Sequence, residues 1–317
     1  MRFRSNASQS VKNSNSLTVG EVMSRTFTRT FRVRWSEINA AGQVHLSEYF
    51  RYVIETAWDW GATIGLSITE SEELGLAWVL HEAEIHLYRP LRANDTFELT
   101  VWLVDWRRVR GTRCFEIVLK DSGELVAQGT QEVVSLDLKS MRPVATPDTI
   151  IDSIRLEAPR VVPHQKIPKF QLRPEVAFVM QKKVEWRDLD SQEHVNNANY
   201  VAFAEDAVAQ ALAAMGWSPA SFQAQSWIVS NPMVHIQYQS PASWGETLEV
   251  VAYLVELKPA GGVWYIQIER ATDREPVARC LVEWSLANRI NGEEQILPES
   301  LAHALKEQLA VAEQLAS

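Results

Sequence analysis

The feature that most constrains this chain is a long internal repeat. When the 317-residue sequence is compared with itself at an offset of 151 residues, identical residues coincide along most of its length. A repeat of this length indicates a duplicated domain, so we expect two units of the same fold. The matching pairs include Val33 and Val184, Trp35 and Trp186, Tyr49 and Tyr200, Gly65 and Gly216, Pro90 and Pro241, and Glu132 and Glu283.

Two further identities lie at an offset of 149 residues. Trp78 then matches Trp227, and His86 matches His235. We therefore expect a two-residue difference in length between the copies, just before the matched prolines.

Each copy shows the same succession of patterns: a short strand, a polar loop, a long helix and a run of strands. In the second copy, apolar residues at steps of three and four predict a helix from about Asn197 to Met215, which Gly216 ends. The segments that follow alternate in polarity and are separated by turn residues, as in an antiparallel meander. The fold class is therefore α+β, with two tandem units of one long helix and one antiparallel sheet.

The repeat and its punctuation predict the domain boundaries. Residues 1–24 are polar and predict a disordered leader, in which Met23 is an alternative start. Five prolines between the copies indicate a linker, and the leucines after Pro298 indicate a terminal amphipathic helix. The resulting ranges are leader 1–24, first domain 25–147, linker 148–178, second domain 179–292 and C-terminal helix 293–317.

Composition excludes several classes of protein. A net charge of -9 argues against a general nucleic-acid binder. Cys114 and Cys280 are the only cysteines, which favours a reducing compartment, and we expect the cytoplasm. No run of about 18 apolar residues occurs, so we expect no membrane span.

One polar cluster stands out: "DLDSQEHVNNANY", Asp188 to Tyr200, which directly precedes the second long helix. Taken singly, its acids and asparagines are typical of turns and helix caps. The first copy has a helix in the same place but not these residues, so the fold does not require them. We therefore interpret the cluster as a functional site.

With this motif the chain resembles the tandem hotdog-fold acyl thioesterases, most closely the acyl-acyl carrier protein thioesterases. The resemblance covers residues 25 to 292 and rests on "WRDLDSQEHVNNANYVAFAED", "AWVLHEAEIHLYRPLRANDTFELTVWL" and "SMRPVATP". It implies that each long helix is wrapped by a curved sheet, that the two domains form an intrachain pseudo-dimer, and that the protein hydrolyses fatty acyl thioesters.

The resemblance also implies residue roles. Asp190 matches the catalytic acid and His194 the histidine that orients the water, while the backbone N–H of Asn197 would polarise the thioester carbonyl. Gln192 stands where the family usually has asparagine, and Pro241 stands near its usual glutamate.

The first copy departs further from the family motif. The residues there are Asn39 for Asp190, Gln43 for His194, His45 for Asn196 and Leu46 for Asn197. We therefore expect the first domain to be catalytically silent and to contribute to the acyl pocket, with Trp60 closing the acyl tunnel or serving only as a core ring.

Four arginines lie close together in "WRRVRGTR". We weigh two interpretations, a solvated strand edge and a docking patch for the anionic carrier, either acyl carrier protein or coenzyme A. The residues are Arg107, Arg108, Arg110 and Arg113.

Other chemistries find no support. His81 and His86 are five residues apart, which does not suit a metal site, and we expect no metal and no cofactor. His86 and His235 are interpreted as core or interface histidines. The alternatives to the leading function are an acyl-coenzyme A thioesterase and a non-catalytic acyl-binding hotdog protein, and a homodimer of such chains is compatible with either.

Overall fold

A computed structural model describes residues 25–168 and 177–316, with side chains described as far as residue 309. The predicted leader lies outside the described residues, as does the part of the predicted linker at 169–176. The first half contains β1 (Thr26–Arg32), α1 (Leu46–Thr63), α2 (Ile68–Glu73), β2 (Leu76–Leu87), β3 (Thr96–Arg107), β4 (Arg110–Leu119) and β5 (Leu125–Asp137). A short helix, α3 (Asp148–Ile154), follows.

The second half repeats this order. Its elements are β6 (Phe178–Lys183), α4 (Asn197–Ala214), α5 (Pro219–Ala224), β7 (Trp227–Tyr238), β8 (Thr247–Lys258), β9 (Gly261–Arg270) and β10 (Pro276–Asn288), and α6 (Glu299–Ala316) ends the chain. From α1 to β5, every helix and strand begins 151 residues before its counterpart. The helix predicted to start at Asn197 is confirmed.

This constant offset corrects one prediction. β2 and β7 begin at Leu76 and Trp227, again 151 residues apart, so no two-residue length difference exists. The counterpart of His235 is Glu84, and the two face each other where β2 pairs with β7. An alignment of two strands that is wrong by two residues still places each side chain on the same face, because side chains alternate between faces with a period of two. The sequence pattern therefore could not reveal the mismatch.

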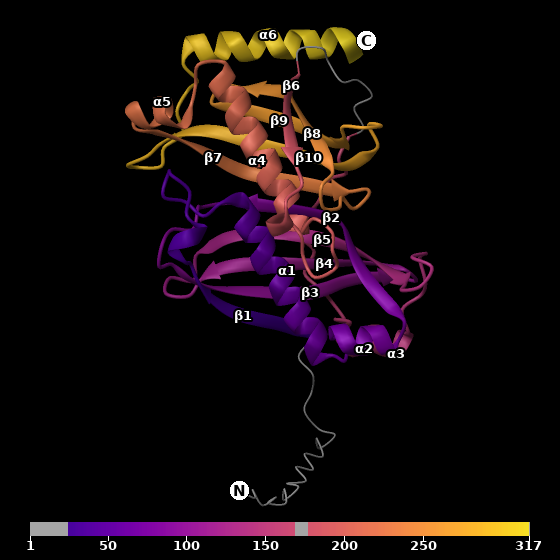
Figure 1. Cartoon of the computed structure of the whole chain (residues 1–317). Helices are drawn as coiled ribbons and strands as arrows, with labels where there is room; N and C mark the ends of the chain where they lie inside the picture. The colour runs from indigo at the N-terminus through magenta and orange to yellow at the C-terminus, as the bar shows by residue number, and fades with distance from the viewer. Residues whose placement is uncertain (1–24, 169–176, 317) are drawn as a thin grey trace, which may run out of the picture.

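The ten strands of the described residues form one antiparallel sheet in the order β1-β3-β4-β5-β2-β7-β10-β9-β8-β6. The two halves join at β2 and β7, through the pairs from Glu82 and Gln237 to His86 and Met233. Figure 1 shows the sheet curving around α1 and α4, which lie on its inner face. This arrangement confirms the expectation of two tandem hotdog domains in an intrachain pseudo-dimer.

Apolar stripes explain how the two helices are held. On α1, Phe50, Val53 and Trp60 are buried, whereas Trp58 is 40% exposed. On α4, four of the ten buried residues are alanine, including Ala204 and Ala207. A face of small side chains lets backbone elements pack at short range.

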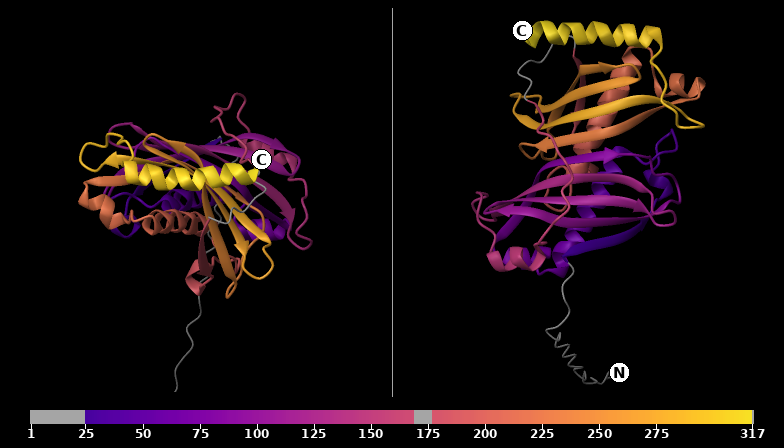
Figure 2. Two further views of the ribbon diagram at one scale, coloured as in Figure 1. Left: turned by 90° about the horizontal axis from the view of Figure 1, so that it is seen from above. Right: turned by 180° about the vertical axis from the view of Figure 1, so that it is seen from behind.

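The outer face of the first half is covered by chain that follows α3 (Figure 2). There Trp102, Cys114 and Val162 form a separate buried cluster. The indole N–H of Trp102 donates to the carbonyl of Arg160 at 2.7 Å, and the N–H of Gln165 donates to Glu84 at 3.0 Å. These contacts fix the part of the predicted linker that the structure describes.

The last helix, α6, packs against β8 at the far end of the sheet (Figure 1). Its residues Leu301 and Leu305 are fully buried, which completes the core of the second half. Among the described residues, none of the helices has the length and apolar character needed to cross a membrane.

Candidate active site

The predicted catalytic residues lie on a closed turn between β6 and α4. The N–H of Asp190 donates to the carbonyl of His194 at 2.9 Å, and the N–H of Glu193 donates to the carbonyl of Asp190 at 3.1 Å. Glu193 has a φ of 62°, in the left-handed region, where the first copy has Gly42 at 81°. The same turn therefore exists in both copies, but the second carries a side chain where glycine is preferred.

Asp190 itself is exposed to solvent. One of its oxygens accepts the backbone N–H of Gln192 at 2.9 Å, and this bond orients the carboxylate. The side chain of Gln192 is exposed. His194 is half-buried and forms an isolated backbone bridge to Ser243. The turn thus brings Asp190, Gln192 and His194 into one short segment.

Asn197 is the first residue of α4, and Asn196 caps this helix. The side-chain oxygen of Asn196 accepts the N–H of Ala198 at 3.0 Å. The N–H of Asn197 has no acceptor within the helix, as for any first residue, so it is free to meet a substrate oxygen. The phenol of Tyr238 donates to the carbonyl of Asn197 at 3.1 Å and fixes this first turn against β7.

Buried polar bonds anchor the base of the loop. Asp188 is buried, and its carboxylate pairs with Lys182 at 2.8 Å. The carbonyl of Asp188 accepts the side-chain amide of Asn199 at 2.8 Å. The carbonyl oxygen of that same Asn199 side chain accepts a hydrogen bond from Arg51 on α1. The first half of the molecule therefore helps to hold the loop that carries Asp190, a contact that the sequence pattern does not indicate.

The turn after β7 forms the opposite side of the site. The N–H of Val195 donates to the carbonyl of Ala242 at 2.9 Å, and the N–H of Ala242 donates to the phenol of Tyr200 at 3.0 Å. Arg270 donates to the carbonyl of Pro241 at 2.6 Å. Pro241 supplies no carboxylate here, and the role of Asp190 as the catalytic acid stays a prediction.

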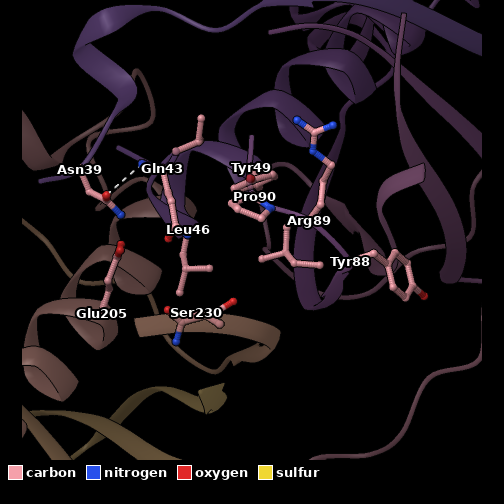
Figure 3. Close-up of a pocket in the computed structure, with 12 residues that line it drawn as sticks. Asn39, Gln43, Leu46, Tyr49, Tyr88, Arg89, Pro90, Glu205 and Ser230 are labelled. Atoms are coloured by element: carbon pink, nitrogen blue, oxygen red, sulfur yellow. Dashed lines mark hydrogen bonds between the residues drawn. The ribbon is translucent and has the colours of Figure 1, made fainter. Parts of the chain in front are cut away.

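The corresponding place in the first copy has the same backbone. The N–H of Leu91 donates to the phenol of Tyr49 at 2.7 Å, as Ala242 does to Tyr200. Asn39 accepts the N–H groups of Ala41 and Gln43 at 2.9 and 3.1 Å. A cavity of about 50 Å³ opens beside these residues, and Glu205 of α4 lines it (Figure 3).

Trp60 lies in the core that both halves share, and it is 4% exposed. Its indole N–H is buried without a hydrogen-bond partner. The predicted role as a tunnel floor stays a prediction, and Trp60 lies on the buried face of α1 as expected.

The four arginines divide into two groups. Arg107, Arg108 and Arg110 are exposed at the β3–β4 turn, where Arg110 pairs with Glu132 at 3.0 Å. Arg113 is more enclosed and donates to Gln131 at 2.7 Å, and burial lowers its pKa to about 10. Arg107 and Arg110 line a cavity of about 340 Å³ beneath the chain that follows α3.

The histidines of the joining strands are interface residues. His235 is buried and hydrogen-bonds Glu82 of the other half at 2.6 Å. His86 bonds Glu84 at 2.8 Å, and this contact raises the pKa of His86. His81, Glu82 and Glu132 lie close enough for one donor atom from each to approach a common ion. This group differs from the pair of His81 and His86, whose spacing in the sequence does not suit a metal site.

Fold and site together define a tandem thioesterase-like protein with one motif-bearing copy. The family model of the thioesterase-like superfamily matches twice, over residues 33–154 and 184–305. The chain belongs to this superfamily.

Relatives and solved structures agree with the fold. A palmitoyl-acyl carrier protein thioesterase of Cuphea hookeriana is 24% identical over 188 residues, which is 56% of this chain and 45% of that protein. The chain thus matches about half the length of such curated relatives. A putative oleoyl thioesterase from Lactobacillus plantarum superposes with a TM-score of 0.71 at 19% identity, covering 86% of this chain and 97% of that one. An acyl-ACP thioesterase from Bacteroides thetaiotaomicron gives 0.68 at 17% identity, covering 82% and 98%.

Proposed function

We propose that the protein hydrolyses fatty acyl thioesters, with acyl-acyl carrier protein as the substrate and a free fatty acid as the product. The observation that carries the proposal is the exposed carboxylate of Asp190, held on a closed turn that leads directly into the first turn of α4. The relatives named above are thioesterases, two of them named for acyl carrier protein.

In this mechanism the carboxylate of Asp190 acts on the thioester carbon, either by deprotonating water or by direct attack. His194 orients the water, and Gln192 extends an amide toward the same place. The N–H of Asn197 donates to the oxygen on which negative charge develops. Arg51 and Asn199 hold the loop through the carbonyl of Asp188, so they are positioning residues.

The carrier is the second part of the proposal. Arg107, Arg108 and Arg110 are exposed at the β3–β4 turn, where Arg107 pairs with Asp105 and Arg110 with Glu132. Together they would meet an acidic carrier protein or the phosphates of coenzyme A. Arg113 joins this proposed docking patch from a more enclosed position. The two free, buried cysteines fit a reducing compartment such as the cytoplasm.

A hydrolysis panel tests the function. Acyl chains of graded length are presented on acyl carrier protein and on coenzyme A, and kcat/KM is measured for each. Preference for the carrier protein supports the proposal, whereas preference for coenzyme A favours an acyl-coenzyme A thioesterase. Binding of acyl chains without turnover on either carrier would indicate an acyl-binding protein and contradict the proposal.

A further inference from the structure

The cavity of the first copy is built by both halves of the molecule. Its polar lining includes Asn39 and Gln43 from the loop before α1, Glu205 from α4, and Ser230 and Asn231 from β7. Figure 3 shows the carboxylate of Glu205 directed toward Asn39. This pocket is separate from the turn that carries Asp190.

The two copies differ in which half supplies the acid. Asn39 occupies the position equivalent to Asp190, so the first loop offers an amide instead of a carboxylate. Glu205 occupies the position equivalent to Ile54 on α1, so the carboxylate comes from the opposite half. The first site has therefore lost the acid of its own loop and gained one from the facing helix.

The groups around this cavity are complementary in hydrogen bonding. The oxygen of the Asn39 side chain already accepts two backbone N–H groups, at 2.9 and 3.1 Å, which leaves its NH₂ as the free donor. Glu205 offers acceptor oxygens across the pocket and is held by His45 at 3.4 Å. One wall thus donates and the facing wall accepts.

The size of the cavity limits the ligand. About 50 Å³ is room for roughly four water-sized groups. A thioester carbon with its oxygen and sulfur, together with one attacking water, fills this space. A long acyl chain would extend beyond this volume.

We propose that this cavity is a second thioester-hydrolysing site, specific for short acyl chains, with Glu205 as the general base. Asn39 donates to the thioester oxygen while the oxygen of water attacks the carbonyl carbon. Glu205 takes the proton of the water. The carbon–sulfur bond then breaks, and that proton passes to the departing sulfur, which gives a carboxylic acid and a thiol. The site rests on the proposed thioester chemistry but not on Asp190, and it departs from the expectation that the first copy is catalytically silent.

Substitutions at the two acids separate the sites. We compare acetyl and hexadecanoyl thioesters of pantetheine as substrates for the wild type, Asp190→Asn and the Asp190→Asn, Glu205→Gln double variant. In Asp190→Asn we expect loss of hexadecanoyl turnover with acetyl turnover kept within about twofold. Adding Glu205→Gln should lower acetyl turnover by roughly a hundredfold, the usual effect of losing a positioned base.

Asp206→Asn is the matched control, because Asp206 is the next residue on α4, is exposed and does not line the cavity. Asn39→Ala gives a second test if the Glu205 variant does not fold, and it should lower the acetyl kcat more than it raises KM. Loss of acetyl turnover in Asp190→Asn alone, or full acetyl turnover in the double variant, overturns the second site. If Asp190→Asn keeps its hexadecanoyl turnover while the acetyl results are as expected, the function proposed for Asp190 is wrong instead.

Discussion

Asp190 and Asp188 lie two residues apart in one loop, yet the structure gives them different environments. Asp190 is exposed and bonded only within its own turn, whereas Asp188 is buried and paired with Lys182. We expect Asp190→Asn to lower kcat for long-chain acyl thioesters by at least roughly a hundredfold and to leave stability nearly unchanged.

Asp188→Asn is the comparison. It removes the charge that faces Lys182 and should destabilise the fold by roughly 1–3 kcal/mol in urea unfolding. If Asp190→Asn destabilises the protein as much as Asp188→Asn does, then the interpretation of Asp190 as a functional rather than a structural acid is wrong.

Trp60 is the residue whose structural and functional roles are hardest to separate. Its ring is buried and its N–H lacks a partner, so the apolar ring stabilises the fold whereas the buried nitrogen costs stability. Trp60→Phe keeps most of the ring and should cost little, whereas Trp60→Ala should destabilise by roughly 3–5 kcal/mol.

If Trp60 also closes the acyl tunnel, Trp60→Ala should move the optimum of kcat/KM to longer chains, since each added methylene gains about 0.8 kcal/mol when room exists. The measurement is kcat/KM over a ladder of chain lengths on folded protein. An equal fall at every length would leave Trp60 as a core residue only.

At the scale of elements, α1 and α4 meet through Arg51. This side chain bonds Glu48 on its own helix and Asn199 on the other, and Asn199 holds the carbonyl of Asp188. Arg51→Ala should therefore lower kcat several-fold while KM changes little, because the loop loses its support but keeps its substrate contacts.

Arg51→Lys, which retains one charged donor, should recover part of this rate. Arg32, an exposed arginine on β1, provides a control through Arg32→Ala. A parallel rise in KM for Arg51→Ala would show that Arg51 contacts substrate instead of positioning the loop.

The β3–β4 turn is the element that carries the arginine patch. Reversing Arg107 and Arg108 to glutamate should raise KM for acyl-acyl carrier protein several-fold and weaken its dependence on salt. Hydrolysis of a small uncharged thioester should stay the same. If the KM for the carrier-bound substrate is also unchanged, the patch is only a solvated turn.

Much of this architecture follows from local sequence. The repeat and the helical stripe predict two units with a helix at Asn197, and the polar cluster draws attention to Asp190 because the first copy lacks it. The offset between the equivalent strands β2 and β7 could not be determined from the sequence, because a shift of two residues preserves the alternating strand pattern. The contact of Arg51 with Asn199 and the position of Glu205 depend on how the halves meet, which no short segment encodes. One local signal was available: Gly42 marks the left-handed turn that Glu193 repeats.

At the scale of the whole molecule, the halves are joined through one sheet and one polar seam. The seam consists of the side chains around the β2–β7 pairing: Glu82, Glu84, His86, His235 and Gln237. In a homodimer, identical residues would face each other on the axis. Here duplication has placed Glu84 opposite its equivalent His235, so an acid faces a histidine instead of another acid. The seam therefore stabilises the paired halves electrostatically and makes that stability depend on pH.

The direction of this pH dependence follows from the groups in the seam. Burial raises the pKa of Glu82 and of Glu84, but hydrogen bonds and charge from His235, Gln237 and His86 outweigh it, and both pKa values lie below the ordinary 4.5. Groups with a lowered pKa stabilise the fold above their unfolded value, and this contribution is lost as the pH falls through the folded value. The pKa of His86 is raised above 6.5 by Glu84, so its contribution is complete below 6.5 and is lost as the pH rises through the raised value.

We therefore expect the free energy of unfolding to be highest between the carboxyl and histidine titrations, to fall as the pH drops below 4.5, and to fall as the pH rises above 6.5. Urea unfolding across this range measures it. Glu82→Gln should reduce the loss of stability in acid, because one of the two low carboxyl pKa values is gone. It should also cost roughly 1–3 kcal/mol at neutral pH, because the amide has one acceptor oxygen for the two partners, His235 and Gln237, that Glu82 now serves. His86→Gln should flatten the loss of stability on the alkaline side, and it should also weaken the acid dependence, because His86 helps to lower the pKa of Glu84. If the free energy of unfolding falls equally in acid for the wild type and Glu82→Gln, carboxylates outside the seam govern the acid instability. The joining strands are then held by their backbone bonds and apolar contacts alone.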